Sequence, residues 1–429
     1  MEFKQLPLVR EQLMKCVRCG KCRELCPVFG QTGIESAAPR GHVFMVQMLR
    51  DGQVKPTPEV YKKLGQCLMC ETCSANCPSG IDVHELNAAA RAYISQNNPN
   101  LARDYLFGRF WTRPDIMKRS MKLMSLAQRL GLQKLARNIG FTRLLPGDMK
   151  DAEKMLENIP PRSARSILPA YTPAQGESRY RVGYFLGCGT DYLNPEIAQA
   201  TVNVLSRNGC EVYIPRGLKC CGLPHIANGK LDVARNLTIH NIKLFEELDL
   251  DYIITDCGSC SATLSAKNLD FVLQGTSSQQ AAARFAARVK DLTVFLIDIL
   301  DIKIDVQTDQ HWRVTYHDPC HLVNAQGITE QPRELLRRIP GVELVEMPHA
   351  QSCCGGSGTY SVTHHQLSMQ ILDKKMEHAV STGAEILATC CPSCIMQLSF
   401  GCRRSHWNAE VLHPVVLLDR VYKQTPATV

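Results

Sequence analysis

Residues 351–358 read QSCCGGSG, and residues 219–224 read KCCGLP. In each stretch two adjacent cysteines are followed by a glycine. Adjacent cysteines are poorly suited to a disulfide, because joining them strains the geometry of the bond. They also suit zinc poorly, since zinc ligands usually stand two to four residues apart. A cysteine pair that occurs twice in one chain points instead to a duplicated site with thiolate ligands.

The sequence around both pairs is repeated in the same order. RVGYFLGC ends at Cys188 and RVTYHDPC at Cys320, while YIITDCGSC and EILATCCPSC follow the two pairs. The spacings between corresponding cysteines are 32 and 33 residues before the pair, and 36 and 37 after it. Agreement within one residue over such distances indicates that the C-terminal half is a tandem duplication.

Each repeated piece is a short β-branched run that leads to cysteine, and the segments between the pieces have helical patterns. Strands that alternate with helices predict parallel α/β units. In such sheets ligands lie beyond the carboxyl ends of the strands, where all of these cysteines fall. We therefore predict two five-cysteine sites. The first site contains Cys188, Cys220, Cys221, Cys257 and Cys260, and the second contains Cys320, Cys353, Cys354, Cys391 and Cys394.

The number five is informative, because a cubane iron–sulfur cluster takes four cysteines. A fifth cysteine next to another ligand allows one sulfur to bridge two irons or to bind a distorted iron. Gly222 and Gly355 follow the pairs and let the backbone approach a cluster without a Cβ. These features favour a cluster more open than a cubane, and a cubane with one spare cysteine is the alternative.

Two further runs, CVRCGKCRELCP at 16–27 and CLMCETCSANCP at 67–78, share the spacing C-x2-C-x2-C-x3-C-P. This is the bacterial ferredoxin pattern for two [4Fe–4S] cubanes, in which the fourth cysteine of each run serves the other cluster. Two zinc sites would need neither the third cysteine step nor the proline. The predicted ligands are Cys16, Cys19, Cys22 and Cys77 for one cubane, and Cys67, Cys70, Cys73 and Cys26 for the other.

The predicted fold is α+β and multidomain. Residues 1–100 form a mostly helical ferredoxin-like domain, in which residues 38–52 suit a short buried helix and Asp82 begins another. The four predicted domains are the ferredoxin-like domain 1–100, a basic helical linker 101–178, and two cysteine-rich domains at 179–305 and 306–429.

The linker carries ten Lys or Arg residues between 101 and 145, opposed only by Asp104 and Asp115. Aromatic residues and methionines are interleaved with these charges, among them Phe107, Trp111 and Met117. Such a segment could be a spacer that packs on its neighbours, a docking site for a partner, or a basic amphipathic surface for a membrane. Residues 159–178 contain four prolines and predict a domain boundary.

The chain has 429 residues, a net charge of +8 and 21 cysteines. A cysteine-rich chain of this length is unlike a small disulfide scaffold. Its N-terminus lacks the apolar core of a signal peptide, and no apolar stretch is long enough to span a membrane. We therefore expect a cytoplasmic protein, with peripheral contact at the inner face of the membrane as an option. The mild positive charge does not imply nucleic acid.

Three cysteines lie outside these sets. Cys210 and Cys402 are expected to be small buried hydrophobes. Cys390 could replace Cys391 by its distance from the preceding pair, but Cys391 keeps the C-x2-C step and aligns Cys390 with Asp256. We therefore prefer Cys391 as the ligand.

Three histidines accompany the five-cysteine sites: His317 and His321 flank Cys320, and His225 follows the first pair. They could relay protons, or they could donate hydrogen bonds near a cluster and tune its potential. The sequence contains no glycine-rich dinucleotide fingerprint, phosphate loop or nucleophile elbow. Substrate oxidation must therefore occur on another subunit, or the chemistry must take place at the clusters.

The CCG repeats resemble the cluster-binding domain of the B-type subunit of heterodisulfide reductase. Together with the ferredoxin runs they resemble a wider family, which includes the iron–sulfur subunits of glycolate oxidase and anaerobic glycerol-3-phosphate dehydrogenase, and the D-type subunit of heterodisulfide reductase. APRGHV at 38–43 and CPSGIDVHEL at 77–86 are most similar to the glycolate oxidase subunit. In the heterodisulfide reductases, the resemblance implies non-cubane [4Fe–4S] clusters on the five-cysteine sets.

The resemblance implies an electron-transfer subunit of a flavoprotein 2-hydroxy-acid dehydrogenase, such as one acting on glycolate or lactate. A partner flavin would supply electrons, and a quinone, a cytochrome or another carrier would accept them. The alternative is a catalytic subunit of heterodisulfide-reductase type that cleaves a disulfide at a five-cysteine cluster.

Overall fold

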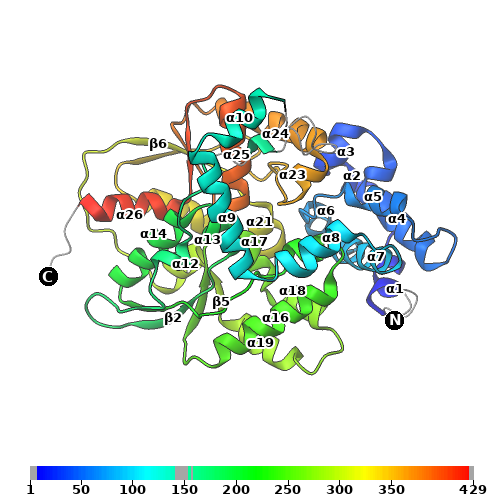
Figure 1. Ribbon diagram of the computed structural model, residues 1–429, viewed down its shortest axis with the longest axis horizontal. Helices are drawn as coiled ribbons and strands as arrows, with labels where there is room; N and C mark the ends of the chain where they lie inside the picture. The colour runs from blue at the N-terminus through cyan, green and yellow to red at the C-terminus, as the bar shows by residue number, and fades with distance from the viewer. Residues whose placement is uncertain (1–6, 141–152, 156–157, 425–429) are drawn as a thin grey trace.

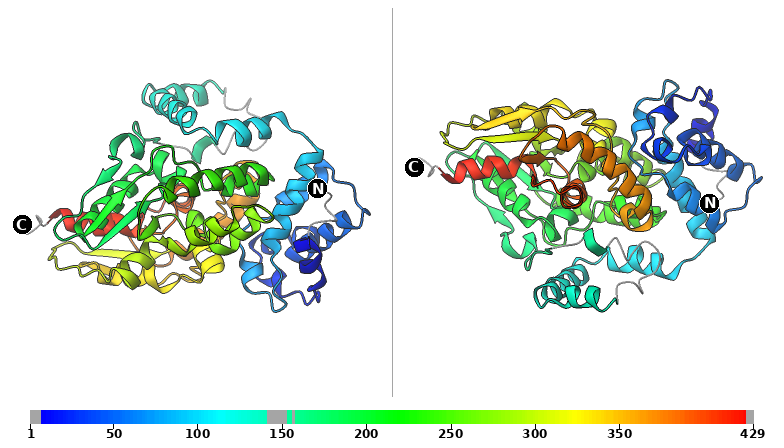
Figure 2. Two further views of the ribbon diagram at one scale, coloured as in Figure 1. Left: turned by 90° about the horizontal axis from the view of Figure 1, so that it is seen from below. Right: turned by 90° about the horizontal axis from the view of Figure 1, so that it is seen from above.

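The helical N-terminal part of the chain and the C-terminal helix lie at opposite ends of the molecule (Figure 1). The computed structural model describes residues 7–140, 153–155 and 158–424. Between the two ends lie the cysteine-rich repeats, and the linker runs along one face of them (Figure 2). The α+β multidomain fold predicted from the sequence is confirmed.

The ferredoxin-like part contains short helices joined by the cysteine loops. The predicted helix at 38–52 is α4, and Asp82 caps α7 by accepting a hydrogen bond from the backbone N–H of Glu85 at 3.0 Å. The helices here are α1 (Pro7–Met14), α2 (Lys21–Glu24), α3 (Pro27–Thr32), η2 (Glu35–Ala37), α4 (Pro39–Arg50), α5 (Pro58–Gly65), α6 (Thr72–Ala75) and α7 (Val83–Asn97).

The described part of the linker is mostly helical, and its basic side chains are mostly exposed. Phe107 and Met117 are buried, and the buried Ser125 hydroxyl donates to the carbonyl of Ile159 at 2.7 Å. Arg143, one of the ten basic residues, lies outside the described residues. No helix within the described ranges is long and apolar enough to cross a bilayer. The linker helices are α8 (Leu101–Tyr105), η3 (Leu106–Phe110), α9 (Pro114–Arg129), α10 (Leu132–Asn138), η5 (Glu153–Met155) and α12 (Ala164–Ile167).

The first repeat is built on a parallel sheet with the order β3-β2-β4-β5, and β1 joins its edge in antiparallel orientation. Its strands are β1 (Tyr171–Thr172), β2 (Tyr180–Tyr184), β3 (Cys210–Tyr213), β4 (Tyr252–Thr255) and β5 (Val289–Asp291). Its helices are α13 (Cys188–Tyr192), α14 (Pro195–Arg207), α15 (Leu223–Ala227), α16 (Leu231–Glu246), α17 (Gly258–Thr263), α18 (Ala266–Leu273), α19 (Gln279–Arg288), α20 (Leu292–Val294) and η6 (Phe295–Ile299).

The second repeat has the equivalent strand order, β7-β6-β8-β9, and all its strand pairs are parallel. The predicted duplication of parallel α/β units is therefore present. Its strands are β6 (Trp312–Tyr316), β7 (Val342–Val345), β8 (Ile386–Ala388) and β9 (Glu410–Leu412). Its helices are α21 (Cys320–Gln326), α22 (Glu330–Arg338), α23 (Tyr360–Thr363), α24 (His365–Val380), α25 (Pro392–Arg404) and α26 (Pro414–Gln424).

The two repeats pack against each other through the loops and helices at the carboxyl ends of their strands. The backbone N–H of Gly258 in the first repeat donates to the carbonyl of Cys390 in the second at 2.9 Å. Helix α26 of the second repeat packs on α14 of the first. This arrangement turns the two cysteine-bearing edges toward each other in the centre of the molecule.

Candidate metal centres

The first ferredoxin run lines a pocket together with the last cysteine of the second run. Arg18 and Gly20 have positive φ in the first loop, and Met69 and Glu71 have positive φ at the corresponding positions of the second. These left-handed residues tighten both loops, so three thiols of each loop face one pocket. The cysteines that line the first pocket are Cys16, Cys19, Cys22, Cys73 and Cys77.

The second ferredoxin pocket is lined by Cys26, Cys67, Cys70 and Cys73. Burial raises the pKa of Cys26 to about 11, so this thiol stays protonated at neutral pH without a metal. A bound iron would displace that proton, because metal ligation requires the thiolate. Cys73 lines both pockets, which makes them neighbours.

The first five-cysteine site lies beyond the carboxyl ends of β2, β3 and β4. The sulfurs of Cys188 and Cys220 are 4.0 Å apart. Hydrogen bonding to the thiols of Cys220 and Cys260 holds the pKa of Cys221 well below its usual range. A Cβ on Gly187 would lie 3.0 Å from the Cys260 sulfur, so the backbone approaches the thiols where a side chain would crowd them.

The second five-cysteine site repeats this arrangement beyond β6, β7 and β8. Hydrogen bonding to Cys353 lowers the pKa of Cys320. The thiols of Cys353 and Cys394 likewise hold the pKa of Cys354 well below its usual range. In both repeats the second cysteine of the pair is thus the one favoured as thiolate, the form that binds metal. The donor sets are chemically suited to iron–sulfur clusters, although ligation by each cysteine stays a prediction.

Cys390 and Cys391 occupy different environments. Cys390 is fully buried beside Tyr316, as Asp256 is beside Tyr184 in the first repeat. Cys391 instead contacts the thiols of the five-cysteine sites. The geometry therefore agrees with the alignment of Cys390 to Asp256. The other two cysteines outside the sets, Cys210 and Cys402, are buried.

The three histidines differ in their hydrogen bonds. Nε2 of His321 donates to the carbonyl of Met69 at 3.0 Å, and Nδ1 exchanges a hydrogen bond with Ser259 at 3.0 Å. The ring nitrogens of His317 and His225 are buried, and the ring of His317 forms a hydrogen bond with the Cys354 thiol. His321 is therefore held in place at the domain interface, whereas the ring of His317 faces a cysteine thiol.

The four cysteine sets form a continuous series. Cys70 of the second ferredoxin set and Cys353 of the second repeat belong to one buried cluster, and Cys320 packs against it. A hydrogen bond between the thiols of Cys257 and Cys391 then connects the two five-cysteine sites. This hydrogen bond is the main cause of the lowered pKa of Cys391. In this series the cysteines of the second repeat therefore lie between those of the ferredoxin-like part and those of the first repeat.

Charged side chains hold the ferredoxin-like part against the first repeat. Arg91 on α7 donates to the carbonyls of Cys67 at 2.8 Å and Ala227 at 2.7 Å. Lys267 on α18 forms ion pairs with Glu71 and Asp82. These contacts fix the position of the ferredoxin cysteines relative to the cysteines of the first repeat.

Two residues lie near the cysteine sites although nothing in the sequence indicates that they do. Lys375 on α24 is buried, burial lowers its pKa to about 8, and its ammonium donates to the carbonyls of His349 and Ala350. Trp111 of the linker packs in the core that includes Cys188 and, after Cys220, contributes to the lowered pKa of that thiol. Only the folded chain brings these residues beside cysteines distant in the sequence.

Protein-family models match four segments of the chain. Residues 12–81 match the 4Fe-4S dicluster domain, and residues 182–265 and 314–399 match the cysteine-rich domain. Residues 98–156 match the linker region of the glycolate oxidase iron–sulfur subunit. The fold and the cysteine sets therefore define an iron–sulfur protein with a two-cluster ferredoxin part and a duplicated cysteine-rich domain.

Curated relatives extend this result to the whole chain. The probable glycolate oxidase iron–sulfur subunit of Bacillus subtilis is 33% identical over 417 residues, which cover 96% of this chain and 93% of the relative. The chain belongs to the family of glycolate oxidase iron–sulfur subunits.

Two other relatives are similar to this chain. A subunit of the fumarate reductase (CoM/CoB) of Methanothermobacter marburgensis is 28% identical over 96% of this chain and 73% of its own length. Lactate utilization protein A of Bacillus subtilis is 31% identical over 56% of this chain and 99% of its own length.

Proposed function

We propose that this chain is the electron-transfer subunit of a 2-hydroxy-acid dehydrogenase that oxidises glycolate or lactate on a partner flavoprotein. The observation that carries the proposal is the continuous series of cysteine sets through the molecule. Iron–sulfur clusters supply one-electron carriers. The sequence has no dinucleotide fingerprint for a flavin of its own. A glycolate oxidase subunit and lactate utilization proteins among the relatives support this substrate class.

The proposed cofactors are two cubane [4Fe–4S] clusters on the ferredoxin sets and non-cubane [4Fe–4S] clusters on the five-cysteine sites. The ferredoxin spacing supports the first assignment. The adjacent cysteines in each repeat, one of them with a lowered pKa, support the second. The contacts between sets support one order, from the first ferredoxin pocket through the second to the second five-cysteine site, and last to the first five-cysteine site.

The two ends of this series differ in their surroundings. Cys19, at the ferredoxin end, is exposed, whereas the other cysteines are buried or half-buried. The opposite end, at Cys188, lies beneath the linker, where Trp111 packs and Tyr192 donates to the carbonyl of Pro114 at 2.9 Å. We infer that the flavoprotein docks near Cys19 and that the acceptor is reached from the linker side.

The exposed surface of α9 and α10 suits an anionic membrane, which would place a quinone near the linker end. Large apolar side chains and positive charges share this surface, and the sequence has no acidic residue between 116 and 140. Basic amphipathic helices with this composition lie in the membrane interface. The linker surface consists of Lys118, Arg119, Lys122, Leu123, Leu126, Arg129, Leu130, Leu132, Lys134, Leu135 and Ile139.

Sedimentation with vesicles tests this surface. The full chain should pellet with phosphatidylglycerol vesicles and not with phosphatidylcholine vesicles. L126E/L130E should abolish pelleting, whereas L101E, at an exposed leucine outside the linker surface, should not change it. Equal binding by both variants would contradict membrane contact through the linker.

The function as a whole is tested on protein purified anaerobically from its native source. Mass spectrometry should find a flavin-carrying dehydrogenase bound to this chain. Cys354→Ser should remove one cluster signal from the electron paramagnetic resonance spectrum and leave the ferredoxin signals. Survival of every signal would contradict the five-cysteine assignment.

A heterodisulfide-reductase activity is the second candidate. Both five-cysteine sites are complete, and the relative from the fumarate reductase (CoM/CoB) matches over almost the whole chain. If no flavoprotein accompanies the native protein, disulfides are the substrates to assay. Their reduction would place the chemistry at the five-cysteine sites of this chain.

A further inference from the structure

The two five-cysteine sites differ in the residue type at one buried position. The repeats align RVGYFLGC with RVTYHDPC, so His317 corresponds to Phe185. The backbone N–H of Phe185 donates to Ile254 on β4 at 2.8 Å, and that of His317 donates to Ala388 on β8 at 2.9 Å. The two residues therefore occupy equivalent places in their sheets.

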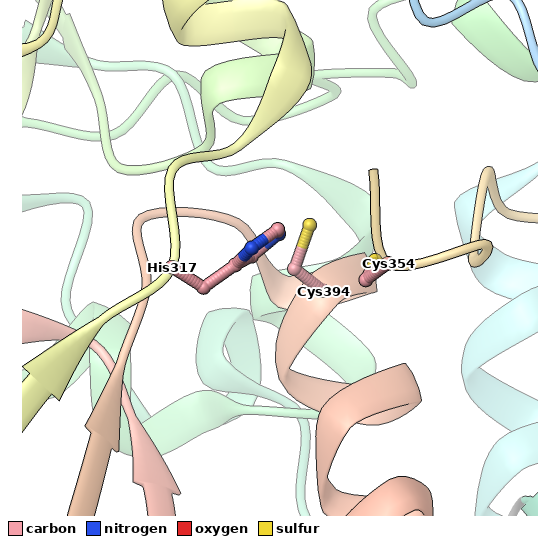
Figure 3. Close-up of side chains that lie close together, drawn as sticks. All are labelled: His317, Cys354 and Cys394. Atoms are coloured by element: carbon pink, nitrogen blue, oxygen red, sulfur yellow. The ribbon is translucent and has the colours of Figure 1, made fainter. Parts of the chain in front are cut away.

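The surroundings of these two side chains differ. Phe185 stacks on the ring of Phe245 at 6.0 Å, as an ordinary core residue. His317 instead lies with Cys354 and Cys394 in one group, whose nitrogen and sulfur atoms are all within 4.8 Å of one another (Figure 3). Among the described residues, this is the group in which a histidine joins cysteines at metal-ligand distances.

The imidazole ring of His317 lies where it could bind a metal between two thiols. The side chain is fully buried, and among the described residues its ring nitrogens have no nitrogen or oxygen partner. The ring does form a hydrogen bond with the Cys354 thiol, which helps to lower the pKa of that thiol. Leaving a buried polar group without a partner costs about 1–3 kcal/mol. His321, only four residues away, is fully engaged with Met69 and Ser259 and has no nitrogen to offer.

Other buried polar groups near this position already have partners. Lys375 donates to His349 and Ala350, and Asp318 is held by Arg333 at 2.8 and 2.9 Å. Neither is therefore available to satisfy the imidazole. An iron held between Cys354 and Cys394 would satisfy one ring nitrogen, because imidazole and thiolate are both good iron ligands.

We propose that His317 is an iron ligand of the second five-cysteine site, which therefore binds its cluster through sulfur and one imidazole nitrogen. The first site, with Phe185 at this position, binds through sulfur alone. This inference rests on the proposed binding of a cluster at the second site. Imidazole ligation raises the reduction potential of iron–sulfur centres in which it replaces thiolate.

The test is nitrogen hyperfine spectroscopy on the full chain, purified anaerobically with its clusters and grown with either ¹⁴N- or ¹⁵N-histidine. Cys394→Ser identifies the signal of the second site by its loss. That signal should contain a strong nitrogen coupling, typical of a directly bound imidazole, which changes with the isotope. His317→Phe, which introduces the residue of the first repeat, should abolish the coupling and shift the second-site potential downward.

His225→Phe is the matched control, because His225 is also fully buried beside a cysteine pair but belongs to no such ligand group among the described residues. It should leave the coupling unchanged. If His317→Phe fails to fold, His317→Ala reconstituted with ¹⁵N-imidazole should restore the coupling with the isotope of the added ring.

The outcomes separate this inference from the proposed function. A second-site signal in the wild-type protein without strong histidine coupling overturns ligation by His317 and leaves the electron-transfer function intact. Coupling that persists in His317→Phe overturns it as well. Absence of any cluster signal that depends on Cys394 overturns both the inference and the proposed second-site cluster.

Discussion

Replacing Arg333 by methionine should strongly destabilise the second repeat, because the substitution leaves the buried carboxylate of Asp318 unpaired. Arg333 on α22 donates to both oxygens of Asp318 at 2.8 and 2.9 Å, and both side chains are nearly buried. Asp318 precedes Cys320 by two residues and takes the place of Leu186 in the first repeat. The ion pair therefore stabilises the loop that presents the first cysteine of the second site.

The size of the effect follows from the burial of the pair. Removing one partner of a buried ion pair costs about 3–5 kcal/mol, whereas replacing both with apolar residues is often nearly neutral. R333M should therefore be much worse than D318L/R333M, which introduces the leucine of the first repeat. Glu346 also accepts from Arg333, but its side chain is half exposed, so E346Q should cost less than about 1 kcal/mol.

Hydrogen exchange of the backbone amides in β6 and α22 measures these differences on the cluster-loaded protein. Since about 1.4 kcal/mol corresponds to a factor of ten, R333M should accelerate exchange by a hundredfold or more. D318L/R333M should accelerate it by about tenfold or less, and E346Q by still less. Equal acceleration in R333M and D318L/R333M would refute the argument, because the cost would then come from lost packing and not from the unpaired carboxylate.

Three other predictions concern the ferredoxin-like part and its contact with the first repeat. Burial, followed by the charge of Asp82, raises the pKa of Glu85 from 4.5 to about 7, so the native state binds more protons than the unfolded chain in this interval. Up to about 3 kcal/mol of stability should be lost as pH rises from 4.5 to 7, and E85Q should flatten this dependence in denaturant titrations. Gly229 has φ +71° and a Cβ there would lie 2.5 Å from the carbonyl oxygen of Arg91, whereas Gly217, at φ +84°, faces open space. G217A should cost about 1–2 kcal/mol from backbone strain alone, and G229A about 1–3 kcal/mol more, with a lower melting temperature as the readout. Anaerobic loading of the apoprotein with iron and sulfide should release protons, because the pKa of Cys26 is about 11; loading without proton release in a pH-stat would contradict this.

Much of the fold could be predicted from local patterns. The alternation of β-branched runs and helical segments predicted the parallel repeats, because period and strand length are local properties. Strands β5 and β9 were not predicted, since neither leads to a cysteine, the feature by which the other strands of the repeats were found. Strand β1 was included in the linker, because its pairing with β3 depends on a contact between segments about forty residues apart.

The candidate sites were predicted as separate sets, and their relation to one another was not. Spacing groups the cysteines of each ferredoxin run and of each repeat, because a short loop brings its own ligands together. Spacing carries no information about which set faces which. The approach of Cys70 to Cys320 and of Cys257 to Cys391 is decided by the packing of whole domains.

The sequence by itself determined the chemistry: 18 of the 21 cysteines fall into four sets by spacing rules that reflect the local geometry of a loop or a strand end. The tertiary structure alone decided the order of the sets and the partners of the histidines. His317 and His321 look alike in HDPCH, yet one lies against two thiols and the other is hydrogen-bonded to Met69, 252 residues away. The physical reason is that hydrogen bonds and burial depend on atoms brought together by folding, which a local pattern does not contain.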